Sequence, residues 1–297
     1  IGAIYGTRGN VNKAIEYFNK SIEVCDKTDN FVQKAANYNN LAVTYTDDEY
    51  NRLKIYIKTK DIYFKLKEEP NLALTYSNIA YTYMKLGQYK RSLNYHNKAL
   101  YLRLKHNNKQ GIATTYKKIG ELYFEQNNYK DSKIFLLKAL KIREELNAEH
   151  KVGMSLFSIA ALYNETNKKI LALKYYKRAC EIFIKYKNYE EIFITKCVII
   201  RLEYVQGTAY KTRLAEINLM RSKYKLNSFR ANFEYWRLCD KVVSETKTIK
   251  ILDVLYQYIQ DELIKMKSKS LKNKFINQRF NKAVIDAWEK TGDSNRK

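Results

Sequence analysis

The sequence of 297 residues contains a single proline and nine glycines. Both residues are enriched in tight turns, so their scarcity argues against an architecture of many short strands and hairpins. No apolar run reaches the roughly 18 residues that a transmembrane helix requires, and no secretory signal is visible. With 45% hydrophobic and 29% charged residues the chain can still build a core. The composition therefore predicts an all-helical chain with no membrane span.

Cysteine and histidine are also rare, with four and three residues that show no metal-binding spacing. Without a C-x-x-C pair, we expect Cys25, Cys180, Cys197 and Cys239 to be buried thiols in a reducing cytoplasm. Neither a metal site nor a cofactor is expected.

Acidic residues are outnumbered, with 31 Asp and Glu against 55 Lys and Arg, which gives a net charge of +24. Such a charge favours acidic partners, among them nucleic acid, anionic proteins and membrane surfaces. It is equally typical of chains rich in Lys, Asn and Tyr because of base usage in their coding DNA. Composition alone leaves both explanations open.

What the chain does have is self-similarity, with a period of about 40 residues along much of its length. A tyrosine ends each first helix of the repeat, and a small residue lies three positions before it. The tyrosines are Tyr5, Tyr45, Tyr83, Tyr123 and Tyr163, and the small residues are Gly2, Ala42, Ala80, Gly120 and Ala160. The best-defined pair of helices spans Gln110–Leu146.

The second helices repeat as well, with small residues on both sides of a large one. These sets are Ala14, Phe18 and Ser21; Ser92, His96 and Ala99; Ser132, Leu136 and Ala139; and Ala172, Tyr176 and Ala179. Gly9, Gly87, Asn127 and Asn167 stand at the turn within the helix pair, where a left-handed backbone suits Gly or Asn. Small residues at these spacings indicate that helix backbones cross closely.

These residues resemble the tetratricopeptide repeat (TPR), whose usual period is shorter, at about 34 residues. The resemblance implies an all-α, right-handed superhelical solenoid of about five to six helix pairs with a helical C-terminal cap. We predict the repeat array over residues 1–205, and degenerate repeats with capping helices over 206–297. The longer period requires longer helices or a longer connection between units, and the stretches at 99–116 and 139–157 fit a second helix extended by about a turn.

Two regions depart from the repeat. In the second repeat Lys54, Lys58 and Asp61 replace the small, large and small residues, which predicts a shifted register using Tyr56, Ile57, Ile62 and Tyr63. Toward the C-terminus, apolar spacing predicts three more helices, roughly over 228–245, 248–267 and 271–290.

Motifs of catalysis are missing: the chain has no P-loop, dinucleotide fingerprint, H-E-x-x-H motif or EF-hand loop. The Asp47-Asp48-Glu49 triplet is expected to be a solvated helix end. Without a nucleophile, a paired base or a phosphate cradle, we expect no enzyme.

Binding is therefore the main question, and the TPR resemblance places it on the concave face formed by the first helices. An asparagine there can pair its amide with an extended peptide backbone, and the resemblance marks Asn40 and Asn78 for this role. The predicted peptide or partner groove consists of Asn39, Asn40, Asn78, Tyr81, Met84, Lys117, Lys118, Glu121 and Phe124. A full carboxylate clamp of the chaperone-binding kind is not predicted, because only Asn78 and Lys118 match it.

The long repeat with groove asparagines resembles the Rap and NprR-type regulators of Firmicutes. That resemblance implies short secreted peptide ligands, control of response regulators or transcription, and a DNA-binding or helical-bundle domain upstream of Ile1. Two alternatives stay open. One is a purely structural scaffold module of a larger sensor protein.

The other alternative is nucleic-acid binding through basic side chains between residues 265 and 282, with Phe275 or Phe280 stacking on bases. The candidate anion contacts are Lys265, Lys267, Lys269, Lys272, Lys274, Arg279 and Lys282. The same residues are more simply explained as the solvated face of a capping helix. The oligomeric state stays open.

Overall fold

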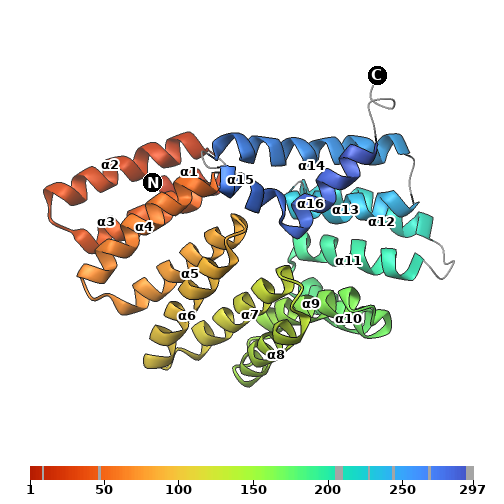
Figure 1. Ribbon diagram of the computed structural model, residues 1–297, viewed down its shortest axis with the longest axis horizontal. Coiled ribbons are helices and arrows are strands. Elements are labelled where there is room, and N and C mark those ends of the chain that lie inside the picture. The colour runs from red at the N-terminus through yellow and green to blue at the C-terminus, as the bar shows by residue number, and fades with distance from the viewer. Residues whose placement is uncertain are drawn as a thin grey trace. The chain divides into compact units, whose positions relative to one another are not determined.

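The computed structural model describes residues 1–8, 10–45, 48–204, 210–226, 228–242, 245–266 and 269–291. Sixteen helices and no strands are found there, which confirms the predicted all-α repeat architecture. From α4 to α11 the helices follow one another along the chain, joined by short connections (Figure 1). Their bounds are α1 Gly2–Thr7, α2 Val11–Lys27, α3 Phe31–Thr44, α4 Glu49–Lys65, α5 Glu69–Lys85, α6 Tyr89–Lys105, α7 Lys109–Glu125, α8 Tyr129–Glu145, α9 Glu149–Glu165, α10 Lys169–Lys185, α11 Tyr189–Tyr204, α12 Tyr210–Tyr224, α13 Phe229–Val242, α14 Glu245–Lys265, α15 Lys269–Ile276 and α16 Arg279–Lys290.

The repeat period divides into two equal halves. Each helix from α4 to α10 has 17 residues, and a connection of constant length joins it to the next. First and second helices have the same length, so both contribute equally to the 40-residue period.

A left-handed residue reverses the chain at each of these connections. The predicted ones, Gly87, Asn127 and Asn167, have φ of 67°, 58° and 57°. Gly9 lies outside the described residues. The connections between repeats use the same conformation at Lys67, Asn107, Asn147 and Lys187, which the tyrosine spacing does not reveal.

The chain forms two compact units. Unit 1 consists of Ile1–Leu122 together with Asp261–Gln278, and unit 2 of Tyr123–Gln260 together with Arg279–Lys297. The predicted division at residue 205, which lies outside the described residues, stays a prediction.

In unit 1 the predicted small and large positions form the core. Ala14 and Phe18 of α2 pack with Leu41 of α3, and Ala42 packs with Ile79 and Tyr83 of α5.

The shifted register of the second repeat is confirmed. Tyr56 and Tyr63 of α4 are buried, whereas Lys54, Lys58 and Asp61 are exposed. The repeat period shortens at the α3–α4 connection, so α4 begins earlier relative to the tyrosine of its repeat than the other second helices do. An early start rotates the inward-facing positions of α4 to other residues.

Two contacts that recur from repeat to repeat tie successive helices together. The first joins the tyrosine that ends a first helix to an aromatic ring of the second helix, with centroid distances of 5.3–5.6 Å. These pairs are Tyr5–Tyr17, Tyr83–Tyr95, Tyr123–Phe135 and Tyr163–Tyr175.

The second contact is a buried arginine near the end of a second helix. In unit 1 Arg103 donates to the Thr115 hydroxyl (2.5 Å) and the Gly111 carbonyl (3.1 Å) of α7. In unit 2 Arg143 makes the same contacts with Ser155 (2.8 Å) and the Lys151 carbonyl (2.9 Å) of α9. Each arginine thereby joins one repeat to the next.

In unit 2, Leu136, Leu156, Ile159 and Phe183 form the core of the fourth and fifth repeats. Toward the C-terminus, Trp288 of α16 stacks on Tyr256 of α14 (3.8 Å) and donates its indole N–H to Asp253 (3.1 Å).

The prediction of one helix over 271–290 is wrong, since α15 ends at Ile276 and α16 begins at Arg279. Asn277 explains the break, because its side-chain amide donates to the Asn273 carbonyl (2.7 Å) and competes with the helical ladder.

The four cysteines are buried free thiols, as expected. Among the described residues, no helix combines the length and apolarity needed to cross a bilayer.

Candidate functional site

The first helices α3, α5 and α7 of unit 1 carry most of the predicted groove residues. Asn39 and Asn78 are half-buried and joined by a hydrogen bond in which the Asn78 amide nitrogen donates to the Asn39 side-chain oxygen (3.0 Å). Asn40, beside them, is exposed. The asparagines of successive repeats therefore form a short ladder, and each of its amides keeps further donor or acceptor capacity.

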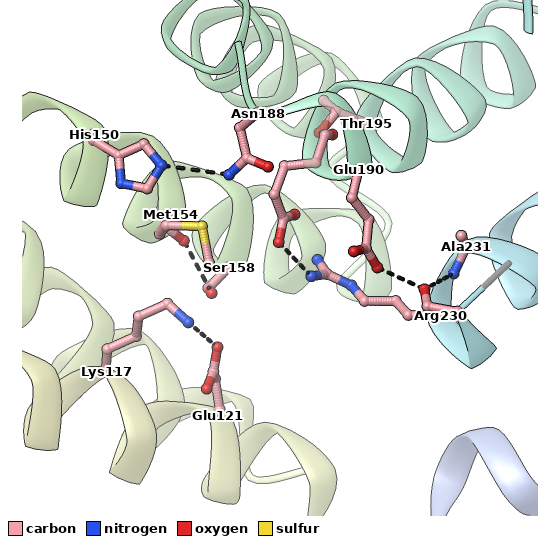
Figure 2. A network of polar contacts seen from close by, with 12 residues as sticks. Lys117, Glu121, His150, Met154, Ser158, Asn188, Glu190, Thr195, Arg230 and Ala231 are labelled. Carbon is pink, nitrogen blue, oxygen red and sulfur yellow. Dashed lines mark hydrogen bonds and ion pairs between the residues drawn. The ribbon is translucent and has the colours of Figure 1, made fainter. Parts of the chain in front are cut away.

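A charged cluster stands next to this ladder. Lys118 of α7 lies 5.2 Å from the ring centroid of Tyr81, one helical turn after Asn78 on α5. Its ammonium group also pairs with Glu121 (3.0 Å). The other carboxylate oxygen of Glu121 pairs with Lys117 one turn away on α7, as Figure 2 shows. Two lysines thus share one carboxylate.

The pKa of Glu121 reflects this arrangement. Burial acts to raise the pKa, but the ammonium groups of Lys117 and Lys118 outweigh burial and hold it below its usual range. The carboxylate stays ionised, so the cluster carries a net positive charge. It is an attractive place for an acidic ligand group.

The remaining groove residues differ in their surroundings. Met84 of α5 is half-buried. Phe124 lies in unit 2, where its ring contacts Tyr129 edge-on (5.9 Å) beside the α8–α9 core. All of the predicted residues except Phe124 thus belong to unit 1, and their joint role as a groove stays a prediction.

His96 of α6 has surroundings that the repeat pattern does not reveal. It is fully buried, and neither ring nitrogen has a hydrogen-bond partner among the described residues. Burial first, and then the charges of Lys118 and Arg103, lower the pKa of His96 to about 3. The imidazole is therefore neutral, and its environment includes the charged cluster of α7.

Unit 2 has a polar network of its own on first helices, which sequence reasoning missed. Arg230 of α13 lies over the Phe157 ring of α9 (4.7 Å) and pairs with Glu191 of α11 (2.9 Å). Ser228 donates to Glu190 (2.5 Å). Asn188 contacts His150 (3.3 Å), as Figure 2 shows. Because the repeat pattern has decayed by residue 228, spacing offers no signal for Arg230.

The predicted anion contacts are divided between the two units. Lys265, Lys269, Lys272 and Lys274 belong to unit 1, whereas Lys282 belongs to unit 2. Lys265 pairs with Glu262 (2.7 Å), and Lys269, Lys274 and Lys282 are exposed. Lys267 and the side chain of Arg279 lie outside what the structure describes. The role of these basic residues as an anion site stays a prediction.

The expectation that Glu49 is solvated is wrong. Glu49 is 5% exposed, and its carboxylate accepts from Arg52 at 2.9 and 3.0 Å. Arg52 also donates to the Tyr45 carbonyl at the end of α3 (2.6 Å). Asp48 caps α4 by accepting from the Asn51 amide (3.0 Å), and Asp47 lies outside the described residues.

The sequence matches tetratricopeptide-repeat family models over residues 1–28, 71–145 and 112–185. The chain contains tetratricopeptide repeats. The matched segments include α5 to α10, where the helices follow one another most regularly. No curated protein matches the sequence at a significant level.

Solved structures with the same TPR fold include several Rap proteins. The apo form of RapI has a TM-score of 0.66 at 18% identity, with 98% of this chain and 97% of that chain covered. The Rap conjugation gene regulator of plasmid pLS20, in complex with the Phr* peptide, has a TM-score of 0.69 at 13% identity, covering 90% and 75%. BtubC from P. vanneervenii has a TM-score of 0.61 at 14% identity, covering 73% and 93%. At these identities the likeness establishes the fold.

Proposed function

We propose that this TPR chain is a regulatory scaffold that binds an extended peptide, or an extended segment of a partner protein, on the first-helix face of unit 1. The observation that carries the proposal is the Asn39–Asn78 ladder beside the Lys117–Glu121–Lys118 cluster. The fold shared with a Rap protein in complex with the Phr* peptide supports it. Signalling in the cytoplasm is part of the same proposal.

The chemistry of the ladder suits a backbone ligand. A primary amide offers one acceptor and two N–H donors, which match the C=O and N–H of an extended chain. Recognition of this kind holds the ligand's backbone, so neighbouring side chains decide selectivity. Here the neighbours are an aromatic ring, Tyr81, and the net positive cluster, which together favour a ligand with an apolar and an acidic group.

The test is a double substitution, Asn40→Ala with Asn78→Ala, assayed against a peptide selected from a random decapeptide library and labelled with fluorescein. We expect its affinity to fall about 10-fold or more, since each lost hydrogen bond contributes roughly 1 kcal/mol. The matched control is Asn94→Ala with Asn97→Ala, which removes two exposed asparagines from second helix α6. Unchanged affinity in the first variant would show that these asparagines do not hold the ligand.

Nucleic-acid binding is the second candidate, and the exposed Lys269, Lys274 and Lys282 favour it. Affinity that depends on many phosphate contacts falls steeply between about 50 and 200 mM salt. Binding of a largely apolar peptide changes little over that range. Titrating the labelled peptide and a labelled single-stranded oligonucleotide at both salt concentrations distinguishes the two functions.

A further inference from the structure

The segment Asp261–Gln278 belongs to unit 1, although the residues before and after it belong to unit 2. It consists of the last turn of α14 and the whole of α15, and is called the strap here. Glu262, Met266 and Phe275 of the strap are 2–3% exposed. A segment from late in the chain is therefore a buried part of the unit that the first repeats form.

The turn between α5 and α6 is buried, whereas the corresponding turns between α7 and α8 and between α9 and α10 are largely exposed. Leu86 is fully buried and Gln88 is 8% exposed. At the corresponding turns of the next two repeats, Gln126, Asn127, Asn167 and Lys168 are exposed. The α5–α6 turn thus differs from its relatives in being covered, and it alone of these three has an apolar first residue.

Gly87 shows which segment covers the turn. A Cβ atom at this position would lie 2.3 Å from the carbonyl oxygen of Lys274 and 2.7 Å from the carbonyl carbon. Asn127 and Asn167 adopt the same left-handed turn with side chains present. The turn itself therefore accepts Asn, and the close approach of the strap backbone is what requires glycine at position 87.

Unit 1 buries two carboxylates that lie far apart in the sequence, Glu49 of α4 and Glu262 of the strap. Glu49 and Glu262 are 5% and 2% exposed, and the charge of Glu262 acts on Glu49. The charged groups around the pair are Arg52 of α4, Lys85 of α5 and Lys265 of the strap, and Tyr56 of α4 also interacts with Glu49. Burial raises the pKa of Glu49 to about 7, against the opposing charges of Arg52 and Lys85 and with the help of Glu262.

We propose that the strap is a detachable latch over the α5–α6 turn, and that ionisation of the buried Glu49 beside Glu262 loosens it. When the strap detaches, water reaches the carboxylates of Glu49 and Glu262. Ionising Glu49 beside Glu262 therefore costs less free energy in the detached state than in the docked state. Docking is fully favoured below the ordinary glutamate pKa, weakens as pH rises toward 7, and is weakest above 7. Detachment would expose the α5–α6 turn.

The first test is Gly87→Asn in the full chain, followed by hydrogen–deuterium exchange with mass spectrometry. Because asparagine keeps the turn but adds a Cβ, we expect at least 10-fold faster exchange in residues 261–278 and 86–88. The exchange of α9 and α10 stays as in the wild type. The matched control, Asn127→Gly, changes an uncovered turn and leaves the strap protected. Wild-type protection of the strap in Gly87→Asn would overturn the proposal.

The second test needs no disruptive substitution. Exchange of the wild-type strap is measured from pH 5.5 to 8.5 and corrected for the intrinsic pH dependence of amide exchange. We expect protection to fall on the order of 10- to 100-fold as pH rises to 7 and then to level off, and Glu49→Gln to remove this fall. Constant wild-type protection, or a fall that persists in Glu49→Gln, would overturn the role of the acid pair, even if Gly87→Asn disrupts folding.

Discussion

His96 stands in α6 where Phe18, Leu136 and Tyr176 stand in other second helices, and all four residues are buried. The other three side chains pack apolar atoms between the crossing helices. His96 instead brings two ring nitrogens that are buried and form no hydrogen bond within the described part of the chain, which costs stability. The third repeat therefore has a weak point at the centre of its packing, close to the proposed binding face.

We expect His96→Leu to stabilise unit 1 by about 1–3 kcal/mol, because it removes two unsatisfied polar atoms at similar volume. The difference in stability between His96→Leu and the wild type grows at acid pH. The folded-state pKa of about 3 lies below the ordinary value, so wild-type stability is lost as pH falls from about 6.5. Urea unfolding of both proteins at pH 7.5 and pH 5 measures this. A smaller difference at pH 5 than at pH 7.5 would contradict it.

At this scale the sequence predicts positions whose role is set by local packing. Ala80, Ala99 and Ala139 are buried as their spacing requires, because close helix crossings leave room only for small side chains. Glu49 could not be predicted in the same way. Its surroundings include Glu262, which belongs to a helix near the other end of the chain, and no periodic pattern connects the two.

At the scale of elements, the connections decide the repeat length. From α4 to α11 each connection holds a residue with φ between 51° and 67°, in a conformation that costs a residue other than Gly or Asn about 1–2 kcal/mol. Lys67 and Lys187 occupy it with side chains that have no local hydrogen-bonding advantage. The equal spacing of the helices is therefore maintained although the backbone is strained at Lys67 and Lys187.

Replacing Lys187 by Gly is expected to raise the free energy of unfolding by roughly 0.5–1 kcal/mol, because glycine accepts φ of 53° without strain. The midpoint of thermal unfolding rises accordingly. The control is Lys185→Gly in the last turn of α10, where glycine lowers helix propensity and destabilises. Differential scanning calorimetry compares the three proteins. If both glycines destabilise equally, the left-handed turn is not strained.

Helix existence in the regular repeats is predictable because apolar periodicity and turn residues agree there. The register of α4 followed from Tyr56 and Tyr63, which are buried as expected. The separation of α15 from α16 was missed. It depends on a single side chain, Asn277, bonding to the backbone of the preceding turn, and such local competition leaves the apolar pattern unchanged.

For the whole molecule, the net charge of +24 acts on the folded state through self-repulsion. We expect the thermal midpoint at pH 7 to rise by a few degrees between about 10 and 150 mM NaCl, as the Debye length falls from about 30 to 8 Å. Sodium sulfate at the same ionic strength is the comparison. Equal effects indicate screening, whereas a larger sulfate effect indicates a specific anion site. A midpoint that falls with salt would show that ion pairs outweigh the repulsion.

The role of the predicted groove residues as a binding site stays a prediction. The resemblance to TPR proteins marked Asn78, and repeat spacing added Asn39, Tyr81 and Lys118. In the structure the Asn78 amide donates to the Asn39 side-chain oxygen, and Lys118 lies over the Tyr81 ring. The shared carboxylate of Glu121 was named only as a groove position, because spacing gives neighbours but not ion pairing. Arg230 was not predicted at all, because the repeat pattern around α13 is too degenerate to assign positions by spacing.

The strap has a consequence for the order in which the protein is made. Residues 1–122 leave the ribosome without the segment that covers Gly87, since residues 123–260 must be synthesised first. At translation rates of about 5–20 residues per second this delay is roughly 7–30 seconds. During that interval Leu86 lacks its cover and Glu49 is hydrated. The α5–α6 turn of the nascent first unit therefore stays open to solvent on the side of Gly87 until residues 261–278 emerge.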